Sequence, residues 1–205
     1  MNSPYCGKFR VTQQYLPGVH DGIDLVGIDS KEIHATVSGT VYTAGWENYK
    51  NPRQGFGQFV CIRGTDGNFY YYGHLSKINV IAGDLVACTD VIGIEGSTGY
   101  STGSHCHYEV RTAPFKGAKV IDVTTIAQIP NVLGGIYDDG YRPPNNTTVP
   151  TKPKKTYNIN NINDVKAVQK ALNAANFNCG EVDGIIGEKT TEAMFNYIAD
   201  TLLQE

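Results

Sequence analysis

Short apolar runs separated by glycine-rich turns dominate the chain from Val11 to about Val123. No helical period of apolar residues persists through this stretch, so the pattern favours strands. The clearest pair is expected over 58–63 and 68–72, on either side of Asp66-Gly67, a dipeptide that tolerates the positive φ of tight hairpin turns. Further strands are expected over 39–44, 85–94 and 105–111. The first part of the chain is therefore predicted to be a mainly antiparallel β domain.

The pattern changes twice toward the C-terminus. Residues 138–156 contain four prolines and almost nothing to bury, as is typical of a linker. Beyond it, Val165, Val168 and Leu172 recur at helical spacing behind an Asn163/Asp164 cap, and a second helix is expected over 188–203. The expected division is a β domain over 1–137, a linker over 138–156 and a small all-α, three-helix domain over 157–205.

Composition agrees with one main domain and a satellite, since the chain has 205 residues, of which 40% are hydrophobic. The formal net charge of −3 argues against a general nucleic-acid binder, which normally carries a basic excess. Five cysteines form no CxxC pair, so free thiols are expected rather than disulfides or a thiolate metal site. No apolar stretch is long enough for membrane insertion, and no secretory signal is visible after Met1.

The candidate chemistry lies with the histidines. His105 and His107 are two residues apart on an expected strand, so their side chains share one face. A straight strand would separate His20 and Asp24 by roughly 13 Å, so a bend is expected, with Gly22 as its place. After such a bend, His20, Asp24 and one of the paired histidines can bind one Zn²⁺, with a fourth position left open.

Three ordered segments resemble signatures of the lysostaphin/LytM-type (M23) zinc endopeptidases: His20-Asp21-Gly22-Ile23-Asp24, Tyr72-Gly73-His74-Leu75-Ser76 and the 96–110 stretch that contains His105-Cys106-His107. The resemblance implies that His20, Asp24 and His107 are the zinc ligands. It also implies that His74 and His105 are the catalytic pair. One imidazole would accept the proton of the attacking water, and the other would stabilise the oxyanion or protonate the leaving amine. Which histidine takes which role is left open.

Other residues near these segments have simpler interpretations. Cys106 stands where the family usually has a larger aliphatic residue, and it is expected to point away from the metal into the core. Glu109 shares the metal-facing side and either orients a ligand histidine or faces solvent. His34 is expected to be structural. Tyr70 and Tyr72 either line a substrate groove or, as the commoner case, fill an aromatic core.

The tail segments 164–173 and 182–193 resemble the small three-helix peptidoglycan-binding domain. The alternative is a helical hairpin that packs on the β domain. A wall-binding tail would raise the effective concentration of a peptidase on an insoluble polymer.

The leading interpretation is a zinc endopeptidase that cleaves peptide bonds of bacterial peptidoglycan, through either a glycine bridge or a diaminopimelate stem. With no visible signal, it is expected to be made in the host cytoplasm and to reach the wall after holin-type release, as a phage or prophage endolysin. A virion-associated lysin is the second setting. The rival is a metal-free member of the fold that binds wall or activates another hydrolase, and the presence of all five expected residues argues against it.

Overall fold

The computed structural model describes residues 3–48, 50–142, 162–174, 178–185, 189–190 and 193. The chain divides into two compact units, Met1–Asn145 and Asn146–Glu205. Among the described residues, no helix is long and apolar enough to cross a membrane.

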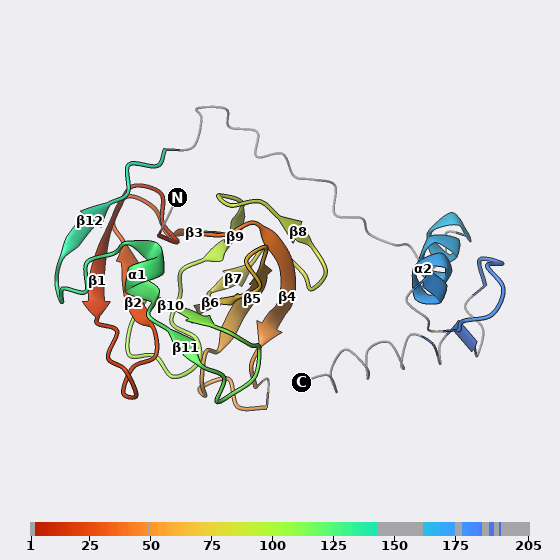
Figure 1. Ribbon diagram of the computed structural model, residues 1–205, viewed down its shortest axis with the longest axis horizontal. Coiled ribbons are helices and arrows are strands. Elements are labelled where there is room, and N and C mark those ends of the chain that lie inside the picture. Colours follow the sequence, from red (N-terminus) through yellow and green to blue (C-terminus); the bar gives the residue numbers. More distant parts are fainter. Residues whose placement is uncertain are drawn as a thin grey trace. The chain divides into compact units, whose positions relative to one another are not determined.

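The first unit consists mainly of strands, with one short helix in its described part (Figure 1). The strands are β1 (Lys8–Gln13), β2 (Ile23–Gly27), β3 (Glu32–His34), β4 (Gly39–Trp46), β5 (Gln58–Gly64), β6 (Phe69–Gly73), β7 (Lys77–Ile78), β8 (Leu85–Val86), β9 (Val91–Ile94), β10 (Cys106–Arg111), β11 (Val120–Ile121) and β12 (Ile136–Asp138). The helix is α1 (Val123–Ala127), and the side chain of Asp122 caps it by accepting from the backbone N–H of Thr124.

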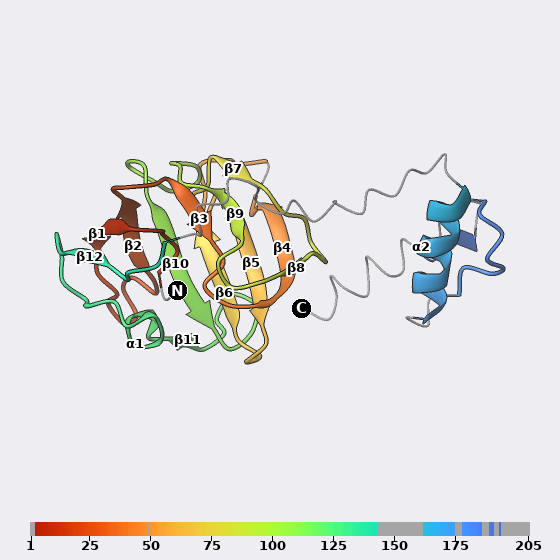
Figure 2. The same cartoon turned by 90° about the horizontal axis from the view of Figure 1, so that it is seen from above.

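The strands form a large and a small antiparallel sheet. The large sheet has the order β12-β1-β2-β10-β6-β5-β4-β8, with β11 paired to β10, and the small sheet has the order β3-β9-β7. Figure 2 shows β2, β10, β6 and β5 running side by side. Strand β10 thus lies between β2 and β6, although these three strands are far apart in sequence. This arrangement confirms the expected mainly antiparallel β domain.

Strict alternation along the central strands separates the core from the functional face. On β10, Cys106, Tyr108 and Val110 belong to the main hydrophobic core, and so do Tyr70 and Tyr72 on β6. The intervening residues point to the opposite face. The core interpretation of Cys106, Tyr70 and Tyr72 is therefore confirmed.

The hairpin expectation is confirmed, since β5 and β6 pair antiparallel around a turn in which Gly67 has φ 85°. The expected continuous strand over 85–94 is wrong. It is broken into β8 and β9, which belong to different sheets. The chain turns here with Thr89 at φ 87°, and the carboxylate of Asp90 stabilises the turn by accepting from the backbone N–H of Ala87 at 2.9 Å.

In the second unit, α2 (Ile162–Ala174) occupies the segment predicted from helical spacing, with Val165 and Leu172 buried. Leu172 packs in a small cluster with Cys179 and Ala193. Most of the expected helix over 188–203 lies outside the described residues, so the three-helix domain stays a prediction. Asp138, which the sequence analysis assigned to the linker, is the last residue of β12, and residues 143–156 of that expected linker lie outside the described residues.

Candidate metal centre

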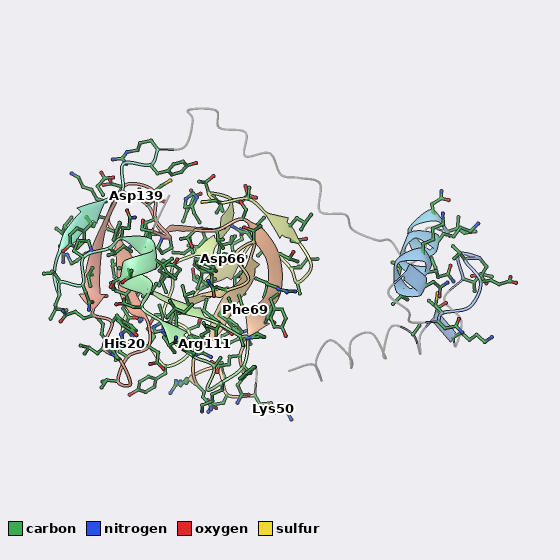
Figure 3. All side chains as sticks on the ribbon, in the orientation of Figure 1. His20, Lys50, Asp66, Phe69, Arg111 and Asp139 are labelled. Carbon is green, nitrogen blue, oxygen red and sulfur yellow. The ribbon has the colours of Figure 1, made fainter. Side chains whose placement is uncertain are left out.

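Strand pairing brings the first three candidate residues together. Strand β10 pairs with β2 so that His107 lies opposite Asp24, a position in which two Cβ atoms are about 4.5–5.5 Å apart. His20 approaches from the segment before β2, and the chain bends at Asp21 and Gly22 before the strand begins. The Oδ1 atom of Asp24 lies 3.2 Å from His20 Nε2 and 2.9 Å from His107 Nδ1, and the two imidazole nitrogens are 3.1 Å apart. Figure 3 labels His20, which lies toward the same end of the unit as Arg111 in that view.

This triangle fits a zinc ion. Four ligands at zinc bond lengths of about 2.0–2.2 Å in a tetrahedron are about 3.3–3.6 Å apart. The three atoms need to separate by only a few tenths of an ångström to reach that spacing. Two imidazoles and one carboxylate also form a donor set that zinc accepts, and among the described residues these three side chains form the group able to hold a metal ion.

The outward nitrogen of each ligand histidine has its own acceptor. The Nδ1 atom of His20 lies 2.7 Å from the backbone carbonyl of Gln14, and the Nε2 atom of His107 lies 3.1 Å from Glu109 Oε2. Since a carbonyl or carboxylate oxygen can only accept, these ring nitrogens carry protons, and His20 Nε2 and His107 Nδ1 are the atoms left for the metal. Glu109 is buried, so the solvent-facing interpretation of this residue is wrong, and its Oε2 atom lies beside the ligand histidine.

Electrostatics favour a cation at this point. Burial works to raise the pKa of Asp24, but hydrogen bonds from His107 and His20 outweigh it and hold that pKa well below the usual range. Burial works to lower the pKa of His107, but hydrogen bonds to Asp24 and Glu109 outweigh it and raise that pKa to about 9. The carboxylates of Asp24 and Glu109 thus both face the ring of His107. A bound divalent cation would replace the proton on its Nδ1 atom.

His74 and His105 lie beside the triangle. Their ring centroids are 4.5 Å apart, and His105 Nε2 is 3.4 Å from Asp24 Oδ2. His74 lies just after the end of β6 with φ 63°, and burial, together with the charges of His105 and His107, lowers its pKa to about 4. His74 is therefore neutral near pH 7 and can accept a proton. The structure thus brings together all five residues that the motifs singled out, whereas His34 is buried elsewhere, 2.8 Å from the backbone carbonyl of Thr89.

Two features of the site were not predicted from the sequence. Gly22 does lie at the bend, but its φ is not left-handed; a Cβ there would lie 2.6 Å from His107 Nε2, so glycine is needed for space. Aromatic packing beside the site is the other feature, since the Phe56 ring lies 5.4 Å from that of His107. The one sequence signal for this neighbourhood is that Arg111 shares the strand face of His107 and Glu109.

The fold and the site together define a β-sheet protein with a His-Asp-His group able to hold a metal ion and two further histidines beside it. The model of peptidase family M23 matches residues 18–122, and the chain belongs to this family of zinc-dependent metallopeptidases.

Three relatives show how far the similarity extends. Lysostaphin of Staphylococcus staphylolyticus is 37% identical over 106 residues, which are 51% of this chain and 21% of that protein. The glycyl-glycine endopeptidase ALE-1 of Staphylococcus capitis is 38% identical over 99 residues, 48% of this chain and 26% of its own. Endolysin 2638A of Staphylococcus phage 2638A is 30% identical over 103 residues, 48% of this chain and 20% of its own.

A solved structure of the antimicrobial peptidase lysostaphin from Staphylococcus simulans matches with a TM-score of 0.52 and 31% identity, covering 68% of this chain and 56% of that one. This match supports the β fold. The chain spans only about a fifth to a quarter of the length of the three sequence relatives.

Proposed function

We propose that this chain is a zinc-dependent endopeptidase that hydrolyses peptide bonds in bacterial peptidoglycan, either in the cross-links or in the stem peptides. The observation that carries the proposal is the triangle of His20 Nε2, Asp24 Oδ1 and His107 Nδ1, with sides of 2.9–3.2 Å. Family membership supports the peptidase chemistry. The relatives named as an antimicrobial peptidase, a glycyl-glycine endopeptidase and a phage endolysin support the wall as substrate.

In this proposal His20, Asp24 and His107 hold the ion. Zinc at such a centre polarises the scissile carbonyl and promotes ionisation of the attacking water. Around it, the chain supplies two imidazoles whose Nδ1 atoms are fixed on backbone carbonyls, at 2.7 Å for His74 and 2.8 Å for His105. Nε2 of each ring thereby faces away from that carbonyl, and Nε2 of His105 lies 3.4 Å from Asp24 Oδ2. One ring, with Nε2 unprotonated, would accept a proton from the water. The other would carry a proton on Nε2 as an imidazolium, and would stabilise the oxyanion or protonate the leaving amine.

The biological setting that we propose is a phage or prophage endolysin that reaches the wall from the host cytoplasm through holin-type release. The similarity to endolysin 2638A supports it. The second unit would serve as a wall-binding module. Its support is the sequence resemblance over 164–173 and 182–193 and the buried face of α2.

Metal content and lysis test the function together. Purified protein should hold close to one zinc per chain, and a chelator should abolish wall lysis that added zinc restores. Asp24→Ala and His107→Ala should each lose the metal, because each removes a ligand atom from the triangle. His34→Gln is the matched control, since His34 is buried outside the centre and should leave zinc content unchanged. Full lysis by metal-free protein would exclude the mechanism, and stoichiometric zinc in both ligand variants would exclude the ligand set.

A further inference from the structure

Three residues on one face of β10 form a continuous series, His107, Glu109 and Arg111, and His105 lies just before the strand. Glu109 connects its two neighbours on that face, because Oε2 lies 3.1 Å from His107 Nε2 while Oε1 accepts a hydrogen bond from Arg111 Nε. Each carboxylate oxygen therefore has a different partner. With 2% of its surface exposed, Glu109 depends on these two partners rather than on water.

Arg111 is itself held by aromatic rings. Its guanidinium carbon lies 4.8 Å from the ring centroid of Tyr71 and 5.5 Å from that of Phe56. The two rings stack on each other at 5.4 Å with an interplanar angle of 22°. A planar guanidinium fixed against aromatic faces can aim Nε at one carboxylate oxygen with little freedom, which a lysine ammonium could not do.

The charge arrangement agrees with this geometry. An ionised carboxylate in a buried position is costly unless a cation faces it, and Arg111 supplies that cation. Paired with Arg111, the carboxylate of Glu109 serves as the acceptor for the proton on His107 Nε2.

We propose that Glu109 and Arg111 are positioning residues that fix the ring of His107 with Nε2–H on Glu109, so that Nδ1 is presented to the metal. The inference rests on the proposed zinc function. Neither residue touches the expected ion, and both act through His107. Arg111 fixes Glu109, Glu109 fixes the tautomer and orientation of the ring, and the ring completes the triangle with Asp24 and His20.

The test measures zinc affinity by competition with a chelator and the His107 tautomer by ¹⁵N NMR of the zinc-loaded protein. Glu109→Ala should weaken zinc binding by about 10–100-fold, the usual effect of losing such an acceptor. Glu109→Gln should recover part of that loss, since its amide oxygen still accepts from Nε2–H while its amide nitrogen cannot accept from Arg111. Arg111→Met keeps an aliphatic side chain against the rings but loses the donor, and should weaken binding by about tenfold.

Arg63→Met and Glu32→Ala are matched controls, because both residues are exposed on other strands, and neither should change zinc affinity. Unchanged affinity in either Glu109→Ala or Arg111→Met overturns the proposal, as does a zinc-loaded wild type whose His107 carries its proton on Nδ1. If Glu109→Ala fails to fold, Glu109→Gln and Arg111→Met decide by the same measurements. If the wild-type protein binds zinc but does not cleave the wall, the proposed function is wrong, whereas this inference about His107 still holds.

Discussion

His74 and His105 are oriented in the same way, by a hydrogen bond from Nδ1 to a backbone carbonyl. The carbonyl belongs to Thr98 for His74 and to Gly103 for His105. Neither belongs to the metal triangle, so His74→Ala and His105→Ala should keep zinc. Each should lose about 10²–10⁴-fold in turnover, the usual contribution of general acid or base catalysis. Unequal losses are expected, because the two roles differ. Zinc content and turnover on purified wall peptides check this, and a near-native rate in either variant removes that residue from the catalytic set.

Gly22 offers a second test at a single residue. A Cβ at this position would lie 2.6 Å from His107 Nε2 and 2.7 Å from the backbone oxygen of Tyr108. The backbone cannot yield cheaply, so the ring of His107 has to move, and Gly22→Ala should weaken zinc binding and reduce turnover by about 10²-fold. Gly18→Ala is the control in the same loop, since its Cβ would meet nothing within 4 Å although φ is 74°. Equal zinc affinity in the two variants would show that His107 does not need the space left by the missing Cβ of Gly22.

Single residues were predicted well where a local rule applied. Two-residue alternation placed His105 and His107 on one face and Cys106 on the other, and that rule needs no knowledge of partners. The role of Gly22 followed no such rule, because the atom it must avoid belongs to a strand far along the chain. Phe56 was missed for the same reason, since its contact with His107 depends on how the loop before β5 folds back.

The same limit governs the strands and helices. The 58–63 and 68–72 strands were predicted because a hairpin is a local structure with its own turn chemistry. The 85–94 segment was misread as one strand because its apolar pattern continues across a turn whose two flanking strands join different sheets. The pairing of β10 between β2 and β6, which creates the site, could be inferred only from the motifs and not from periodicity.

Glu95, which lies just after β9, connects several segments of the first unit by hydrogen bonds. Its carboxylate accepts from Tyr5 Oη at 2.6 Å, Gly27 N at 2.9 Å, Lys31 Nζ at 2.8 Å and Ser104 Oγ at 2.6 Å. Burial works to raise the pKa of Glu95, but these hydrogen bonds outweigh it and lower that pKa below its ordinary value. The ionised form is therefore the one that stabilises the fold.

Glu95→Gln should lower the free energy of unfolding at pH 7 by about 1–3 kcal/mol, because charge-assisted hydrogen bonds become neutral or unpaired. For a depressed carboxyl pKa, the stabilisation is complete above the unfolded pKa and is lost as pH falls through the folded one. Wild type should therefore lose more stability than Glu95→Gln as pH falls below the ordinary pKa of a glutamate. Denaturant unfolding at a series of pH values measures this free energy of unfolding. The exposed residue Glu32 supplies the control variant, Glu32→Gln. Parallel curves for wild type and Glu95→Gln would contradict the argument.

For the whole molecule, the two-unit organisation was visible in composition, but its boundary was not. The expected linker began at residue 138, whereas β12 pairs with β1 through residue 138, with Tyr137 opposite Phe9. Strand β12 forms by pairing with β1, which is far away in sequence, and such pairing cannot be recognised from local composition. The second unit presents the opposite case, since helical spacing alone located α2. Its wall-binding role rests on a resemblance and therefore needs an experiment of its own.

A chain ended after Asn145 should retain a folded, zinc-loaded peptidase, because every residue assigned to the chemistry lies in the unit Met1–Asn145. It should cleave soluble stem peptides at the rate of the full chain. It should clear intact walls more slowly, by about 10²-fold or more, because tethering to an insoluble polymer supplies that much effective concentration.

The other half of this prediction concerns the tail alone, and sedimentation with purified sacculi tests it. The 157–205 fragment should pellet with walls and stay in solution without them, and an Asn145-ended chain should pellet less than the full chain. Soluble-peptide turnover is the internal control, since a truncated chain that loses it has been damaged rather than untethered. If the fragment stays in the supernatant while the truncated chain lyses walls as fast as the full chain, the tail is a packing or assembly element rather than a wall-binding module.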